Sequence, residues 1–85
     1  MFLPRKVDVS NGGSKEVQLH AFKLGYFWEY DQIKLNDRFS LCHLHSHYLY
    51  FNKDGTIWYS DDQKYFRQEK EYTLYKIENF LQLEK

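Results

Sequence analysis

The sequence has little of several residue types that usually constrain a small domain. Its 85 residues include one Cys, one Pro and four Gly. A single Cys cannot close a disulfide within the chain, and small domains of oxidising compartments usually carry several. The N-terminus lacks the apolar run of a signal peptide, and no apolar segment is long enough to cross a membrane. We therefore expect a cytoplasmic protein that makes no membrane contact.

An excess of charge of either sign is also missing. Twelve Lys and Arg balance twelve Asp and Glu, which leaves a formal net charge of zero. Proteins held to phosphate by long-range attraction normally carry a basic excess. Nucleic acid is therefore an unlikely partner, and single-strand binding through strand aromatics is kept only as a second alternative function.

Aromatic side chains, in contrast, are abundant. Eight Tyr, seven Phe and two Trp make up 20% of the chain. Each ring can bury on the order of 150–250 Å², which compensates for the thin stability margin of so short a chain. We expect one small folded domain over residues 1–85.

Alternating apolar and polar residues predict a mainly β fold. Val7-Asp8-Val9 and the segment 17–21 read as a hairpin around Asn11-Gly12-Gly13-Ser14, and the apolar segment 23–30 reads as a bent strand. The predicted architecture is an antiparallel meander of five to seven short strands, closed into a small barrel or sandwich.

The strongest local signal is a hairpin between residues 48 and 59. Two β-rich segments, Tyr48-Leu49-Tyr50-Phe51 and Thr56-Ile57-Trp58-Tyr59, flank an Asp54-Gly55 turn. A two-residue turn would place Phe51 opposite Trp58 and Tyr50 opposite Tyr59.

The last quarter of the chain supports two interpretations. Ser60-Asp61-Asp62-Gln63 fits a helix capping box, and Leu74, Ile77 and Leu81 recur at helical spacing. The segment 72–77 is instead rich in strand formers, and a turn at Glu78-Asn79 would lead into a strand over 80–83. We favour two strands; the alternative is an α+β fold with a C-terminal helix over Lys64–Leu83.

Three histidines alternate with other residues in the middle of the segment 41–51. In a β-strand His43, His45 and His47 would point to one face, where two of them could share a metal ion. Zinc would need a further ligand, for which His20 is a candidate. A half-exposed strand whose histidines pack over aromatic neighbours is the simpler interpretation, so we expect no cofactor and keep a zinc-binding domain as the alternative.

The same geometry argues against an enzyme. Cys42 and His43 are adjacent, as are Ser46 and its flanking histidines, so in a strand each pair faces opposite ways and cannot form a nucleophile–base pair. Cys42 is better read as a small buried hydrophobe.

The predicted hairpin has large side chains on both faces. We expect one face, with Leu49, Phe51 and Trp58, to belong to the core. The other face could be covered by the C-terminal segment with Phe80, Leu81 and Leu83, or it could be exposed as a binding surface. That candidate binding face consists of Tyr48, Tyr50, Ile57 and Tyr59.

Together these features predict a small, non-enzymatic, intracellular β-rich protein that binds another macromolecule, most readily a protein. Its size, zero net charge and tyrosine-rich strands are typical of an accessory or inhibitor protein of a phage or mobile element. A homodimer joined through an open sheet edge or the aromatic face is a further hypothesis.

Overall fold

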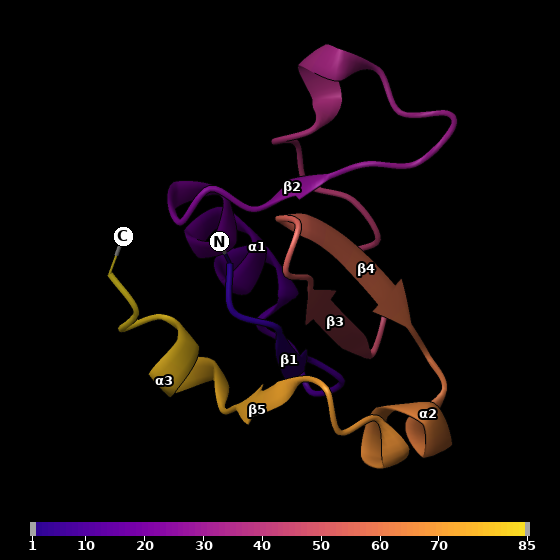
Figure 1. Ribbon diagram of the computed structural model, residues 1–85, viewed down its shortest axis with the longest axis vertical. Coiled ribbons are helices and arrows are strands. Elements are labelled where there is room, and N and C mark those ends of the chain that lie inside the picture. The colour runs from indigo at the N-terminus through magenta and orange to yellow at the C-terminus, as the bar shows by residue number, and fades with distance from the viewer. Residues whose placement is uncertain (1, 85) are drawn as a thin grey trace.

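A five-stranded mixed sheet and three short helices make up the fold, which is therefore α+β (Figure 1). The computed structural model describes residues 2–84. In chain order the elements are β1 (Arg5–Asp8), α1 (Ser14–Lys23), β2 (Phe27–Trp28), the 3-10 helix η1 (Leu35–Asp37), β3 (Tyr48–Phe51), β4 (Thr56–Ser60), α2 (Gln63–Gln68), β5 (Thr73–Tyr75) and α3 (Ile77–Phe80).

The sheet is not the predicted antiparallel meander. Its strand order is β2-β4-β3-β1-β5. The pairs β1–β3 and β3–β4 are antiparallel, whereas β1–β5 and β2–β4 are parallel. Parallel neighbours need crossover connections instead of tight turns, so the chain cannot run as a simple meander.

Helix α1 replaces the predicted second strand of the first hairpin. Val17 and Ala21 are fully buried one helical turn apart, while Leu19 between them is 44% exposed. Alternation over 17–21 is therefore accidental, because the buried positions follow the helical period. The helix ends at Leu24, and Gly25 follows with φ 102°, a left-handed conformation that glycine adopts readily at this position.

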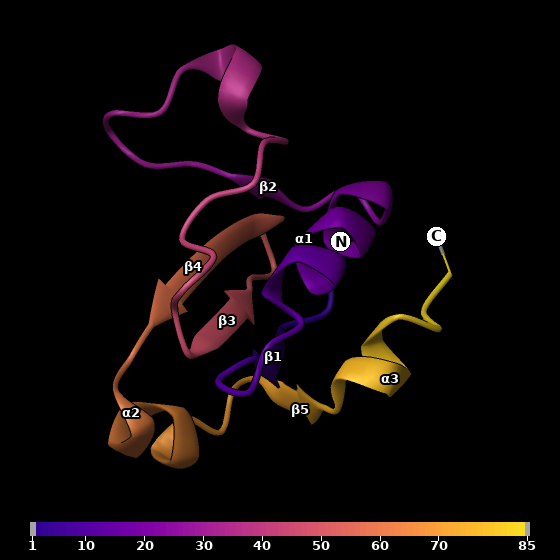
Figure 2. The same ribbon diagram turned by 180° about the vertical axis from the view of Figure 1, so that it is seen from behind.

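One face of the sheet packs on α1 and α3 to form the apolar core (Figure 2). Leu49, Phe51 and Ile57 point to this face, and Phe51 stacks on Phe80 of α3 with ring centroids 4.8 Å apart. The buried members of the apolar core are Val7, Val9, Val17, Ala21, Tyr26, Trp28, Leu49, Phe51, Ile57 and Phe80.

The predicted hairpin is present as β3 and β4, but its register is shifted by one residue. Phe51 lies opposite Ile57 and Tyr50 opposite Trp58. The loop holds three residues instead of two, because Asn52 pairs with Thr56 through a 2.9 Å backbone hydrogen bond. Gly55 closes this loop with φ 90°, the arrangement expected for a three-residue turn with a left-handed last residue.

The shift exchanges the two faces of β4. A one-residue slip moves every side chain of a strand to the opposite face. Ile57 therefore lies in the apolar core instead of the predicted tyrosine face, and Trp58 leaves the predicted core face for the other side.

Helix α2 covers that other face. Phe66 of α2 stacks on Tyr48 with ring centroids 4.3 Å apart and packs near Tyr50 at 6.0 Å. The helix begins two residues later than the predicted capping box requires. Asp62, not Ser60, is the N-cap, and its side chain accepts a 3.1 Å hydrogen bond from the Tyr65 N–H. We call Tyr48, Tyr50, Phe66 and the half-buried Tyr72 the tyrosine cluster.

Neither interpretation of the last quarter is wholly right. The alternative predicted α+β correctly, but the continuous helix over Lys64–Leu83 is wrong, because α2 ends at Gln68 and β5 follows. Strand formers over 72–77 do yield β5, whereas the expected strand over 80–83 is wrong. Instead α3 ends at Phe80, which is fully buried in the apolar core, and a turn follows it.

Between β2 and β3 the chain makes a long excursion over residues 29–47, which extends away from the sheet (Figures 1 and 2). Leu35 and Phe39 on this excursion are exposed. None of the helices within residues 2–84 has the length and apolar character needed to cross a membrane.

Candidate functional site

The histidine segment does not form the predicted strand. Strand β3 begins only at Tyr48, and His43 has a left-handed backbone with φ 49°. A turn forms here, since the Ser46 N–H and hydroxyl both donate to the His43 carbonyl at 3.1 and 2.9 Å. His43, His45 and His47 are therefore not aligned on one strand face.

The Gln18 side chain pairs with the backbone of this segment in the place of a neighbouring strand. The fully buried Gln18 amide donates to the Cys42 carbonyl at 2.6 Å and accepts from the Cys42 N–H at 3.0 Å. It also donates to the Ser14 hydroxyl and accepts from the Trp28 indole N–H. The side chain thereby satisfies the backbone groups that a strand partner would otherwise pair.

The predicted zinc ligands occupy separate environments. His43 stacks on Tyr59 with centroids 3.6 Å apart, and His20 on α1 donates a 2.7 Å hydrogen bond to the Leu83 carbonyl. His45 and His47 are exposed on the segment before β3. Over the part of the chain that the structure describes, no three His, Cys, Asp or Glu side chains are grouped so as to hold a metal ion.

The predicted binding face is mostly closed. Tyr48, Tyr50 and Ile57 are buried, so for these three residues the covered alternative holds and the exposed one does not. The expected cover was the C-terminal segment; α2 covers the two tyrosines instead, and the register shift buries Ile57 in the apolar core. Tyr59 alone of the four is exposed, at 48%.

Tyr59 lies beside the same hollow as two of the predicted histidines, on the apolar-core side of the sheet. Together with His43 and His45 it lines a shallow hollow of about 470 Å³, whose other walls come from the same turn. The structure thus groups one predicted binding residue with two predicted metal ligands. Apart from Tyr59 and Asp61, its walls belong to the single segment 41–46.

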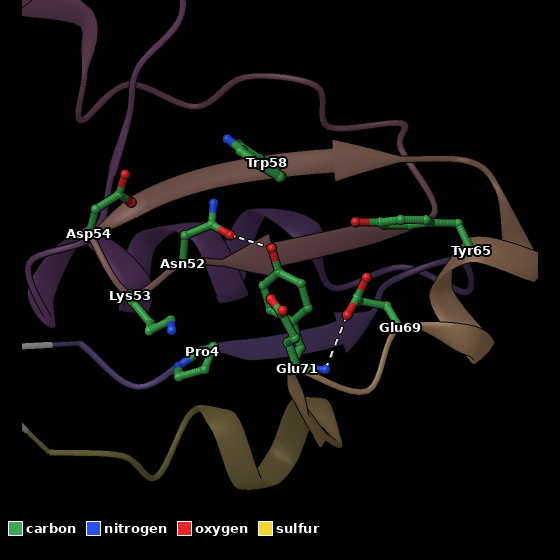
Figure 3. A pocket seen from close by; sticks show the side chains of 9 residues that line it. Pro4, Asn52, Lys53, Asp54, Trp58, Tyr65, Glu69 and Glu71 are labelled. Atoms are coloured by element: carbon green, nitrogen blue, oxygen red, sulfur yellow. Dashed lines mark hydrogen bonds between the residues drawn. The ribbon is translucent and has the colours of Figure 1, made fainter.

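A second opening combines residues from distant parts of the chain, and we call it the aromatic pocket (Figure 3). It has a volume of about 340 Å³ and lies between the β3–β4 turn, β4, α2 and the segment leading to β5. Trp58 extends from β4, while Tyr65 and Glu69 approach from α2 and its end. The lining residues are Pro4, Asn52, Lys53, Asp54, Trp58, Tyr65, Glu69, Glu71 and Tyr72.

The tyrosine cluster supports the aromatic walls of this pocket. Tyr65 and Tyr72 each pack in a T-shaped arrangement against Tyr50, with ring centroids 5.5 and 5.3 Å away. Trp58 is the cross-strand neighbour of the same Tyr50 and is 52% exposed. Tyr50, only 1% exposed, is therefore a neighbour of all three rings that reach the surface.

Hydrogen bonds hold the polar side of the aromatic pocket. The Tyr72 hydroxyl donates to the Asn52 side-chain oxygen, and Asn52 in turn donates to Thr56. Asp54 accepts from the Thr56 N–H and hydroxyl at 3.0 and 2.6 Å. The Glu69 carboxylate accepts a 3.1 Å bond from the Glu71 N–H. These bonds fix the turn and the segment before β5 against each other.

The charges lining the aromatic pocket are mainly negative. Three carboxylates, of Asp54, Glu69 and Glu71, face one lysine, Lys53. The hydrogen bonds from Thr56 lower the pKa of Asp54 below its ordinary value. Burial raises the pKa of Tyr72 to about 12 and also raises that of Tyr65. At neutral pH the phenols are therefore uncharged, and the pocket attracts cations.

Lys6 anchors the helix that brings Tyr65 and Glu69 to the pocket. This buried side chain of β1 donates to the carbonyl of Phe66 and, at 2.7 Å, to that of Glu69. Carbonyls at a helix C-terminus lack partners within the helix, and a cation there satisfies them. Burial lowers the pKa of Lys6 below its ordinary value.

Sequence reasoning missed the aromatic pocket. Trp58 was assigned to the core because the turn was counted as two residues, and Tyr65 and Tyr72 lay in the ambiguous last quarter. One local signal was available, since Asp54 followed by Gly55 and Thr56 can form an Asx turn that favours the longer loop.

No family model matches this chain, and neither the curated proteins nor the solved structures include a match to it. The case for a function therefore rests on the geometry and charge of its own residues.

Proposed function

We propose that this chain is a non-enzymatic, intracellular binding protein, and that its partner is another protein held at the aromatic pocket. The supporting observation is Trp58, a large aromatic side chain that is 52% exposed beside a pocket with walls from several segments. Trp and Tyr are enriched among the few residues that dominate binding energy. Concave, largely apolar openings with a few convergent polar groups are the usual binding sites.

The charge of the pocket favours a protein over a nucleic acid. Three carboxylates lie among its rings, and they would repel a phosphate backbone. A protein surface that presents a basic side chain would be attracted instead. An accessory or inhibitor role, of the kind found in phages and mobile elements, is compatible with a domain that offers one rigid aromatic site.

Trp58→Ala tests this proposal, with Tyr59→Ala as the matched control. Tyr59 is the next residue of β4, is similarly exposed at 48%, and points to the opposite face. Each variant carries the same affinity handle, and retention of a specific partner from source-cell lysate is quantified against the wild type. We expect Trp58→Ala to reduce retention at least tenfold, as loss of a hot spot does, and Tyr59→Ala to change it less than twofold.

The control also decides between the two faces of the sheet. If Tyr59→Ala abolishes retention and Trp58→Ala does not, the binding site lies at the hollow beside His43 and the proposal is wrong. Circular dichroism of both variants must match the wild type, so that loss of retention cannot be assigned to unfolding.

Self-association is a second prediction about partners. Within residues 2–84 strand β5 pairs with β1 alone, so its other edge is open, and Leu74 on it is 60% exposed. An open edge can pair with a copy of itself. Light scattering after size exclusion would detect a dimer, and Leu74→Lys should convert it to a monomer.

A further inference from the structure

We infer that the aromatic pocket takes a trimethylated lysine side chain of the partner protein. This inference rests on the proposed function and specifies the chemical group that the partner presents. Two features carry it: three aromatic walls and a surplus of negative charge.

The aromatic walls suit a cation without N–H groups. Trp58, Tyr65 and Tyr72 come from β4, α2 and the segment before β5, and all three line one small opening. The negative face of an aromatic ring attracts a cation within about 6 Å of its centre, and cages of such rings recognise quaternary ammonium groups. Because burial raises the pKa of Tyr72 to about 12, its ring stays neutral at physiological pH.

The polar groups supply the negative charge, and three of their oxygen atoms already accept hydrogen bonds within the chain. One oxygen of Asp54 accepts two bonds from Thr56, the Asn52 oxygen accepts from Tyr72, and one oxygen of Glu69 accepts from the Glu71 N–H. An unmodified ammonium brings three donors and a guanidinium five, all of which need acceptors when water is removed. A trimethylammonium group carries the same charge and brings no donor.

The size of the pocket also favours a single side chain. Its volume of about 340 Å³ is at the small end of the usual range for ligand sites, roughly 300–1,000 Å³. A nucleotide would bring negative charge next to Glu69 and Glu71, which line the same opening.

The test is a binding titration of the whole chain with three short, otherwise identical peptides, followed by nuclear magnetic resonance of the backbone amides and the Trp58 indole. One peptide carries trimethyllysine, one carries lysine, and one carries the neutral analogue in which carbon replaces the charged nitrogen. We expect the trimethyllysine peptide to bind at least about fivefold more tightly than either of the others. The shifts should centre on Trp58, Tyr65 and Tyr72.

Three variants sharpen the result. Trp58→Ala should abolish the preference for the trimethylated peptide, and Tyr59→Ala should preserve it. Glu71→Gln keeps the shape of the pocket and removes one charge, so it should weaken the trimethyllysine peptide more than the neutral analogue. Equal binding of the charged and neutral forms, tighter binding of unmodified lysine, or shifts centred elsewhere would each overturn the inference.

The two proposals fail separately. If no peptide prefers the pocket but Trp58→Ala still reduces partner retention, the choice of trimethyllysine is wrong and the binding site stands. If the peptide binds at Trp58 but partner retention does not depend on Trp58, the ligand chemistry is right and the proposed function is wrong.

Discussion

The two faces of the sheet differ in their side chains and in the helices that cover them. The apolar core lies under α1 and α3 and includes one buried amide, Gln18, whose two donors and one acceptor oxygen all have partners. The tyrosine cluster lies under the six-residue helix α2. Its Tyr50 hydroxyl is buried and has no hydrogen-bond partner within residues 2–84.

This difference separates stability from binding. A closed apolar face gains free energy from every ring it buries, whereas the other face leaves Trp58 half-exposed and carboxylates unneutralised. Buried polar groups without partners and exposed aromatic rings are costly for folding alone. A half-exposed tryptophan beside carboxylates of the same pocket is what a binding surface requires.

The largest effect should come from the apolar core. Phe51→Ala removes a fully buried ring that stacks on Phe80, so we expect a loss of about 3–5 kcal/mol in the free energy of unfolding. Phe66→Ala in the tyrosine cluster should cost at least about 1 kcal/mol less, because water can reach the site once the short α2 loosens. Urea unfolding followed by circular dichroism measures both.

Equal losses for the two phenylalanine variants would contradict the proposed difference between the faces. Because Phe51→Ala could leave too little stability to measure, Phe51→Leu and Phe66→Leu provide a milder pair with the same expected order.

The buried amide should come next. Gln18→Leu keeps the volume of the side chain but leaves the Cys42 N–H and carbonyl and the Trp28 indole N–H without partners. We expect a loss of about 2–4 kcal/mol and faster hydrogen exchange at the Cys42 amide. Gln32→Leu, on the exposed excursion, is the matched control and should change stability by less than about 0.5 kcal/mol.

Lys6 tests the anchoring of α2. Lys6→Met preserves the length of the side chain and removes the bonds to the Phe66 and Glu69 carbonyls, so we expect a loss of about 1–2 kcal/mol. Lys64→Met, on the exposed side of the same helix, should be nearly neutral. A loss of similar size in both variants, measured by urea unfolding, would show that the buried ammonium has no special role.

The smallest effect on the free energy of unfolding should appear at alkaline pH. The pKa of Tyr72 is about 12 in the folded chain and 10.0 in its ordinary state, so the folded state keeps the proton longer than the unfolded state. The resulting stability is fully present below pH 10 and is lost as the pH rises through about 12. Tyr72→Phe should reduce this alkaline loss, as measured by urea midpoints at pH 8, 10 and 11.5.

An unchanged alkaline loss in Tyr72→Phe would assign the effect to other tyrosines. Burial also raises the pKa of Tyr50, so Tyr50→Phe then becomes the informative variant. Because that change also removes the unpartnered hydroxyl, it should cost little stability at pH 7.

Local signals predicted local structure well. The β3–β4 hairpin forms where β-rich segments flank Asp54-Gly55, and α2 begins within the segment that carried the helix-start signal, although Asp62 caps it instead of Ser60. The segment 17–21 was predicted as a strand because Val17 and Ala21 fit a strand and a helix equally well over so short a span. The hydrogen bond from buried Gln18 to Cys42, 24 residues away, favours the helix, and no local pattern indicates it.

The candidate site could not be predicted from local sequence patterns, because its residues come from separate segments. Trp58, Tyr65 and Tyr72 belong to three segments, and nothing in their spacing indicates that α2 folds back over β3. The histidine row shows the opposite error, since its regular spacing suggested a strand. The turn at His43–Ser46 and the Gln18 amide hold that segment in another conformation.

The sequence by itself determined the number of aromatic rings, the balance of charge, the position of the hairpin and the approximate start of α2. Each of these depends on composition or on residues a few positions apart. Only the tertiary structure decided which rings are buried, because one extra residue in the turn after Phe51 moves Trp58 to the opposite face of the sheet. It also decided what covers each face, since α1, α2 and α3 reach the sheet through contacts between residues distant in the chain.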